Sequence, residues 1–179
     1  MGREVRRVPP NWQHPTNGVC CDGTPQYVPF HDGADLAQQT AEWDAGAAAW
    51  SLGFCSEWAA AGLEFVTRDP AQQDCTYDEW AGLRPNPDDY MPAWPDQFRT
   101  HLVMYETTSE GTPISPAFAS LEELARWLAD NNASAAGDLT ATYEQWLSMC
   151  RQGSAPSIVF SAAGMESGVA AVSSRGNVS

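Results

Sequence analysis

The chain of 179 residues contains no lysine: all nine of its basic residues are arginine, a bias typical of GC-rich genomes. It has no apolar run of 18 residues, so we expect no segment that spans a membrane. The opening residues, MGREVRRVPPNWQHP, carry charge but no apolar stretch and predict no secretory signal. The phosphate-binding loop, the G-x-G-x-x-G dinucleotide motif and the G-x-S-x-G nucleophile elbow are also missing. We therefore expect a cytoplasmic protein that works without a cofactor.

Acidic residues dominate the charge of the chain, with 23 of them against nine arginines and a net charge of −14. The excess is uneven, because residues 20–96 hold 14 acidic residues and two arginines, whereas residues 1–19 have a net charge of +2. A negative field of this strength repels nucleic acid and attracts basic proteins. We expect a partner with a basic surface and no direct binding to nucleic acid. The composition does not indicate an oligomeric state.

The cysteines do not predict disulfides, because their number is odd and their spacing matches no disulfide framework. They are Cys20, Cys21, Cys55, Cys75 and Cys150. Free thiols suit a reducing cytoplasm. Zinc takes four ligands in a tetrahedron, and His14, Cys20, Cys21 and His31 lie within 18 residues. Two adjacent cysteines cannot easily face one ion, so we predict no metal site; an N-terminal zinc site is the alternative.

The order of the expected elements predicts an α+β fold, with several helices packed on a small antiparallel sheet of two hairpins. Residues 1–33 are rich in proline and glycine, which forbids a long helix and indicates an extended N-terminal arm. Residues 34–179 then form a single α+β domain. Hydrophobic residues make up 43% of the whole chain and include eight tryptophans, which suits a core built around indole rings.

Helices are expected in four places. Apolar residues at seven-residue spacing predict one long helix or two shorter ones over residues 34–61, with a break near Gly53. A Thr-x-x-Glu capping box predicts a short helix from Thr76 to Gly82. A second cap and an apolar stripe predict a helix at residues 120–130, and a third cap at Thr142 starts a helix that ends near residue 151.

Two β-hairpins complete the expected fold. Residues 101–118 begin with a run of β-branched and aromatic residues and contain a Ser-Glu-Gly turn. The second hairpin pairs residues 157–162 with residues 168–172 around Ala163-Gly164. The hydroxyl-rich stretch 106–116 has two interpretations: a turn held by side-chain hydrogen bonds to the backbone, or a recognition loop.

Catalysis has weak support in the sequence, and we assign no catalytic residue. A cysteine nucleophile paired with His101 requires proximity and a low thiol pKa, which spacing alone does not give. The adjacent carboxylates Asp78-Glu79, Asp88-Asp89 and Glu122-Glu123 fall at predicted helix starts or in loops, where water solvates them. A small hydrolase or transferase using His101 is the weakest of the alternatives.

The acidic middle of the chain is the strongest candidate for binding a partner. Its carboxylates run through proline-containing loops together with aromatic residues of the kind enriched at protein interfaces. A row of carboxylates can compete with nucleic acid for an arginine-lined channel. The predicted partner-binding residues are Asp69, Asp74, Asp78, Glu79, Asp88, Asp89, Tyr90, Trp94, Asp96, Glu106 and Glu110.

Several blocks of the chain resemble a family of small uncharacterised phage and prophage proteins. The blocks are GREVRRVPPNWQHP at residues 2–15, TYDEW at 76–80, DYMPAWP at 89–95, YETTSEGTPISP at 105–116, EELARWLAD at 122–130 and ATYEQWL at 141–147. The pair Cys20-Cys21 and the tail after Ala171 fall outside the blocks. The resemblance implies a phage protein acting in the cytoplasm of a bacterial host, and it carries no known activity. It favours an acidic inhibitor of the anti-CRISPR type, with a structural protein of the virion or its assembly as the alternative.

Overall fold

The computed structural model describes residues 2–59, 62–72, 74–107, 111–161 and 164–175. The elements confirm the predicted α+β class. The described chain divides into two compact units, residues 32–91 and a second unit made of residues 1–31 and 92–179. This division differs from the predicted arm and domain, because residues 1–31 belong with the C-terminal half of the chain.

The discontinuous unit is built on a four-stranded antiparallel sheet in the order β7-β6-β1-β8. Strand β1 (Gly2–Val8) pairs at residues 3–8 with β6 (His101–Glu106) and at residues 2–4 with β8 (Ser154–Pro156). The short strand β7 (Thr112–Pro113) pairs with β6, which confirms the first predicted hairpin. The start of the predicted arm is thus an inner strand. Its seven residues precede the first proline, so their backbone N–H groups are available to both neighbouring strands.

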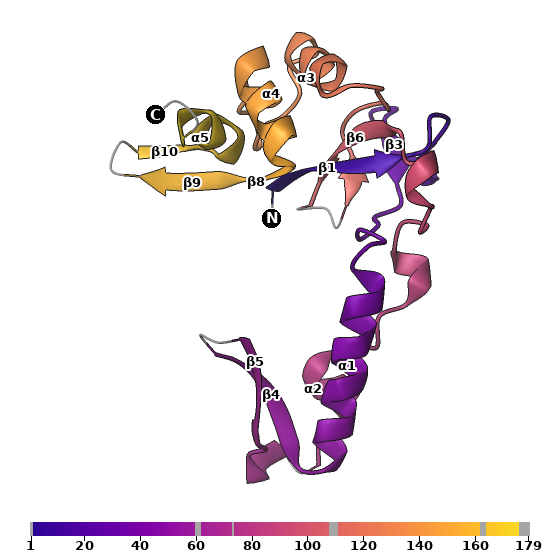
Figure 1. Ribbon diagram of the computed structural model, residues 1–179, viewed down its shortest axis with the longest axis vertical. Coiled ribbons are helices and arrows are strands. Elements are labelled where there is room, and N and C mark those ends of the chain that lie inside the picture. Colours follow the sequence, from indigo (N-terminus) through magenta and orange to yellow (C-terminus); the bar gives the residue numbers. More distant parts are fainter. Residues whose placement is uncertain (1, 60–61, 73, 108–110, 162–163, 176–179) are drawn as a thin grey trace. The chain divides into compact units, whose positions relative to one another are not determined.

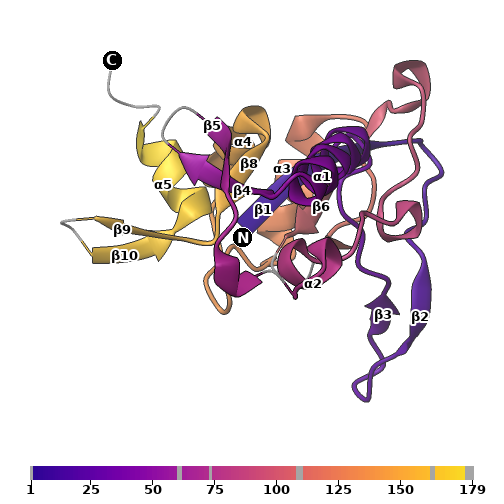
Figure 2. The ribbon, with the colours of Figure 1, turned by 90° about the horizontal axis from the view of Figure 1, so that it is seen from below.

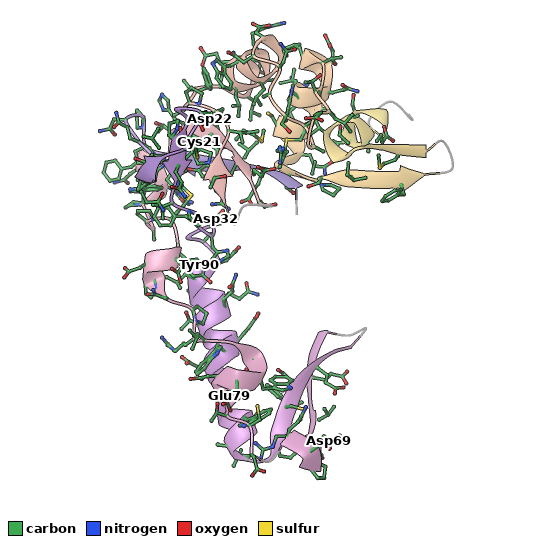
Figure 3. The ribbon with its side chains drawn as sticks, turned by 180° about the vertical axis from the view of Figure 1, so that it is seen from behind. Cys21, Asp22, Asp32, Asp69, Glu79 and Tyr90 are labelled. Atoms are coloured by element: carbon green, nitrogen blue, oxygen red, sulfur yellow. The ribbon has the colours of Figure 1, made fainter. Side chains whose placement is uncertain are left out.

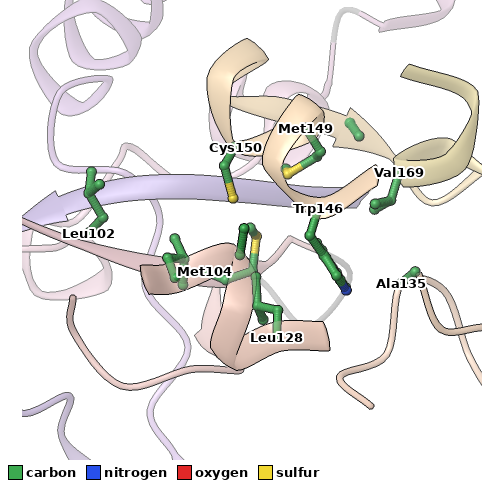
Figure 4. Close-up of a cluster of buried hydrophobic side chains, with 11 residues drawn as sticks. Leu102, Met104, Leu128, Ala135, Trp146, Met149, Cys150 and Val169 are labelled. Carbon is green, nitrogen blue, oxygen red and sulfur yellow. The ribbon is translucent and has the colours of Figure 1, made fainter. Parts of the chain in front are cut away.

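Helices α3 (Leu121–Asp130), α4 (Tyr143–Gln152) and α5 (Gly168–Arg175) lie on one side of β1 and β8 (Figure 1). The predicted caps of the first two are present: the Ser120 hydroxyl accepts a hydrogen bond from the Glu123 backbone, and Thr142 with Gln145 forms a capping box. The apolar faces of these helices meet the sheet in one core. Figure 4 shows the fully buried Trp146 of α4 near Leu128 and Val169.

Two small hairpins complete this unit: β2 (Thr16–Val19) with β3 (Pro25–Tyr27), and β9 (Ile158–Ser161) with β10 (Gly164–Ser167). Figure 2 shows them extending from different sides of the sheet. The prediction that residues 168–172 are a strand is wrong, because they begin helix α5. The Ser167 hydroxyl caps the start of this helix by accepting a hydrogen bond from the Ala170 backbone. Val169 is buried in the core, and the alanines that follow it favour a helix.

Residues 32–91 form a separate unit in which a hairpin runs back beside a long helix (Figure 1). Helix α1 (Leu36–Ser51) is followed by β4 (Phe54–Ala59), β5 (Gly62–Thr67) and the short helix α2 (Tyr77–Ala81). The predicted break near Gly53 is confirmed, since this residue has a φ of 87°. The helix expected beyond it is wrong: residues 54–59 pair with residues 62–67 as strands.

Single turns of 3₁₀ helix connect these elements. They are η1 (Pro70–Gln72) and η2 (Pro87–Asp89) in the 32–91 unit and η3 (Asp96–Phe98) in the other unit. The predicted capping box of α2 is present, because the Thr76 hydroxyl accepts a hydrogen bond from the Glu79 backbone and the Glu79 carboxylate accepts one from the Thr76 backbone.

Candidate functional site

Most of the negative charge of the protein belongs to the 32–91 unit. This unit holds 12 acidic residues and two arginines, a net charge of −10 out of −14 for the whole chain. Every one of these carboxylates except that of the half-buried Asp32 is on an exposed residue. We call residues 32–91 the acidic unit. Its charge faces water, so a cationic partner can reach it without first displacing protein.

Six of the predicted partner-binding carboxylates lie in the acidic unit, and all six residues are exposed: Asp69, Asp74, Asp78, Glu79, Asp88 and Asp89. Figure 3 shows Asp69 and Glu79 toward the same end of the unit. Asp69 accepts a hydrogen bond from the Ala71 backbone at the start of η1. The hydrogen bonds from Thr76 lower the pKa of the Glu79 carboxyl, so Glu79 remains ionised. These local bonds fix the carboxylates on turns and helix starts.

Tyr90 also belongs to the acidic unit, but it is buried with 6% of its surface exposed. Its hydroxyl donates a hydrogen bond to Gln39 Oε1 at 2.7 Å. Burial raises the pKa of the phenol, and the charges of Asp35 and Asp89 act in the same direction. Burial and the bond to Gln39 of α1 give Tyr90 a structural role, and its role as a partner anchor stays a prediction.

Three other predicted residues lie in the second unit and have structural roles there. Trp94 packs against Trp12 with the ring centroids 4.6 Å apart, and Asp96 forms an ion pair with Arg99. The carboxylate of Glu106 accepts a hydrogen bond from the buried Arg3 at 2.7 Å. The predicted residue Glu110 lies outside the described residues.

The expected recognition loop shows the features of a well-formed turn where it is described. Ser115 is buried, and its hydroxyl accepts a hydrogen bond from the Met104 backbone at 2.9 Å. The backbone of Gly111 donates to the carbonyl of Glu106. Side-chain and backbone hydrogen bonds hold this segment to β6, as the first of the two interpretations predicts.

A groove of about 780 Å³ opens along one face of α1 in the acidic unit. One wall comes from the residue that precedes α1 and from residues of α1, at spacings of three or four that place them on one face. They are Asp35, Gln38, Gln39, Glu42 and Trp43. The opposite wall comes from α2 and the segments near it: Ser56, Tyr77, Trp80, Ala81, Leu83 and Pro85. The groove combines carboxylates with three large aromatic rings.

The aromatic rings of this groove are held in a packed cluster. Trp43 and Tyr77 meet edge to face with centroids 5.0 Å apart, and Trp80 lies 5.2 Å from Trp50. The indole N–H of Trp43 donates to the carbonyl of Gly82 at 3.0 Å. Trp43, Tyr77 and Trp80 are only half-buried, so ring surface is left for a ligand.

Sequence reasoning missed this groove. It interpreted Trp43 as part of the apolar stripe and Asp35 as a candidate cap of the helix over residues 34–61, and it gave no role to Glu42, although residues seven apart share a helix face. That spacing was the available signal. The position of α2 opposite this face depends on tertiary contacts.

The residues considered for catalysis and metal binding are distributed over both units. His101 is half-buried at the start of β6, whereas Cys55 and Cys75 belong to the acidic unit. Burial raises the pKa of the Cys150 thiol to about 12, which keeps it neutral and poorly nucleophilic. Within the described residues, no group of three or more His, Cys, Asp or Glu side chains is arranged to hold a metal ion.

The ring nitrogens of His14, one of the residues of the alternative zinc site, face protein atoms. Nδ1 lies 3.0 Å from the Tyr105 hydroxyl, and Nε2 lies 2.5 Å from the Val28 carbonyl. Because the carbonyl only accepts hydrogen bonds, Nε2 carries the proton and Nδ1 accepts from the Tyr105 hydroxyl. A zinc ion on His14 would require one of these hydrogen bonds to break.

No helix in the part of the chain that the structure describes is both long and apolar enough to cross a membrane. Comparisons of the chain with protein-family models, with curated proteins and with solved structures found no match.

Proposed function

We propose that this protein is a non-catalytic inhibitor that occupies a basic surface of a bacterial complex that handles nucleic acid. We further propose, from the resemblance of its sequence blocks to phage proteins, that it is a phage-encoded, anti-CRISPR-like binder acting in the host cytoplasm. The observation that carries the proposal is the concentration of a net charge of −10 in residues 32–91, on carboxylates that are almost all exposed.

The physical basis is competition between two polyanions for one cationic surface. Duplex DNA presents about one charge per 1.7 Å of its axis. Helix α1 has 16 residues and is about 24 Å long, and the unit built on it carries 12 acidic residues against two arginines. Such a field accelerates the approach of a basic partner and loses strength as salt is added. Inhibition then requires only binding, and no bond needs to be made or broken.

Arg3 and Arg6, two of the three N-terminal arginines, form ion pairs within their own unit. Arg3 and Arg6 are buried in the other unit, where Arg3 pairs with Glu106 and Arg6 lies 3.3 Å from Glu4. Arg6 also lies over the ring of Tyr105 and donates to the Phe30 carbonyl. These guanidinium groups therefore stabilise the fold of their own unit.

The test is capture of host proteins from a bacterial lysate at low and at high salt, with two matched variants. One variant changes four exposed carboxylates of the acidic unit to amides: Asp74, Asp78, Asp88 and Asp89. The control changes four exposed carboxylates of the other unit: Glu123, Asp130, Asp138 and Glu144.

We expect the wild-type protein to capture a nucleic-acid-handling complex at low salt and to reduce that complex's binding of nucleic acid. The acidic-unit variant should lose most of this capture, while the control should retain it. Capture of no protein at low salt, or equal loss in the two variants, would contradict the proposal.

A second candidate function is a structural role in a virion or in its assembly. It is favoured by the hairpin β9–β10, where Phe160 and Met165 face each other across the strands with 79% and 63% of their surfaces exposed. An exposed apolar pair on a two-stranded hairpin suits contact between subunits. Mass spectrometry of purified phage particles distinguishes the two functions, because the inhibitor is expected to be absent from them.

A further inference from the structure

We propose that the groove between α1 and α2 binds an arginine side chain from a basic segment of a partner protein. The guanidinium would stack on the exposed ring surface of Trp43 or Trp80 and pair with the carboxylates of Asp35 and Glu42. This inference deepens the proposed function and rests on it for the identity of the partner. It assigns the anchoring contact to one place on the acidic unit.

The first support is the composition of the groove walls. Asp35 and Glu42 are exposed residues on one face of α1, and among the described lining residues none is basic. Asp35 precedes the helix but its side chain makes no capping hydrogen bond, so this carboxylate is not committed to the end of α1. Glu42 accepts one hydrogen bond, from Gln38, through a single carboxylate oxygen. Both groups retain accepting capacity toward a ligand.

The second support comes from the two arginines of the acidic unit itself. Arg68 lies over the ring of Trp50 with its guanidinium carbon 4.5 Å from the centroid. Arg84 donates two hydrogen bonds to Asp44, at 2.8 and 2.9 Å, in a forked geometry. The unit thus already binds one guanidinium on an indole ring and another on a carboxylate. The groove presents both kinds of group, and neither arginine lines it.

Arginine suits these walls better than lysine. Its guanidinium is planar, so it stacks on aromatic faces and donates in parallel to a carboxylate, whereas an ammonium is a compact and more strongly hydrated charge. The volume of about 780 Å³ lies within the range of ligand pockets. A nucleic-acid phosphate is excluded from this groove by the carboxylates.

The experiment measures binding of two short peptides, acetyl-Gly-Arg-Gly-Arg-Gly-amide and its lysine analogue, by isothermal titration. The groove variant is D35N/E42Q, which retains the size of both side chains. The matched control is E57Q/E64Q, because these two exposed carboxylates face each other across β4 and β5, belong to the same unit and do not line the groove. Both variants lower the negative charge equally.

We expect the arginine peptide to bind the wild-type protein more tightly than the lysine peptide. D35N/E42Q should lower the affinity for the arginine peptide by about fivefold, and E57Q/E64Q should lower it by less than about twofold. These changes lie within the range measured for exposed charge pairs. Trp80→Leu should lower the affinity for the arginine peptide and reduce the difference in affinity between the arginine and lysine peptides. Equal effects of the two double variants, or equal binding of the two peptides, would overturn the proposal.

Capture from lysate separates this inference from the proposed function. If D35N/E42Q captures the host complex as well as the wild type while the four-carboxylate variant does not, the inhibitor function stands and the groove is not its anchor. If the arginine peptide requires the groove but no complex is captured, the groove binds arginine and the proposed function is wrong.

Discussion

The Tyr77 hydroxyl lies against the backbone of Gly46, at a place on α1 where a side chain would collide with it. A β-carbon added to Gly46 would be 1.9 Å from this oxygen and 2.7 Å from the ring carbon that carries it. Glycine at this position lets the aromatic ring of α2 pack directly on the helix, and any larger residue forces Tyr77 to shift. This contact sets the position of the wall that forms the groove.

Gly46→Ala tests this contact through stability. Alanine favours a helix interior over glycine by about 1 kcal/mol, but here the added methyl forces Tyr77 to move, and overpacking costs roughly 1–3 kcal/mol. We expect a net loss of stability, measured by urea unfolding with tryptophan fluorescence. The control is Ala48→Gly at an exposed position of the same helix, which should cost about 1 kcal/mol by propensity alone. A Gly46→Ala protein more stable than the wild type would contradict the packing.

The ion pair between the buried Arg3 and the half-buried Glu106 gives a second prediction. Arg3 is 2% exposed, donates to the carbonyl of Ser134 at 2.8 Å and meets the Glu106 carboxylate at 2.7 Å. Glu106→Gln removes the carboxylate with which Arg3 forms its ion pair, and a buried charge left without its partner costs up to about 3 kcal/mol. The loss should appear as a lower urea midpoint with little change in binding of a basic partner.

Glu122→Gln is the control for this ion pair, because Glu122 pairs with Arg151 at 3.4 Å on the surface. An exposed pair contributes about 0–1 kcal/mol. Similar losses of stability from the two substitutions would mean that the burial of Arg3 does not strengthen its ion pair.

His14 predicts a dependence of stability on pH. Burial lowers the pKa of its imidazole below the ordinary value of 6.5, the charge of Arg6 acts in the same direction, and the hydrogen bond to the Val28 carbonyl only partly opposes them. The unfolded chain therefore takes up a proton below about pH 6.5 that the folded protein resists. Stability is complete above this pH and falls as the pH drops below it.

Thermal unfolding between pH 7.5 and pH 5.5 measures the effect. His14→Gln removes the titrating group, so its melting temperature should change less over this range than that of the wild type. The carboxyls of Asp22, Asp44 and Glu79 also have lowered pKa values, but they titrate at lower pH and affect both proteins alike. An identical slope in the two proteins would contradict the role assigned to His14.

The cysteines should differ in reactivity according to burial. Cys20 and Cys21 are exposed, whereas Cys55 and Cys150 are buried and the pKa of Cys150 is raised to about 12. At pH 8 a disulfide reagent should modify the exposed pair quickly and leave the buried pair unmodified until urea unfolds the chain. Peptide mapping after timed quenching identifies the sites. Rapid modification of Cys150 in the folded protein would show that the core around α4 opens readily.

Local signals in the sequence correctly predicted the local elements. The caps at Thr76, Ser120 and Thr142 were identified because a hydroxyl and the backbone three residues later lie within one turn and need no other part of the chain. The apolar stripe at residues 121–128 predicted helix α3 for the same reason. The net charge of residues 20–96 also follows from the sequence alone, since net charge is a sum over residues and does not depend on the fold.

Tertiary contacts decided the rest. Gly2–Val8 became an inner strand because residues about 100 and 150 positions later supply its partners, and residues 168–172 became a helix because Val169 finds a place in the core. Long-range packing also buries Tyr90. It likewise brings α2 opposite Asp35 and Glu42 to form the second wall of the groove. Composition and short-range spacing therefore determined how much charge this protein carries and where its helices begin, whereas long-range packing decided which of those charges line a groove.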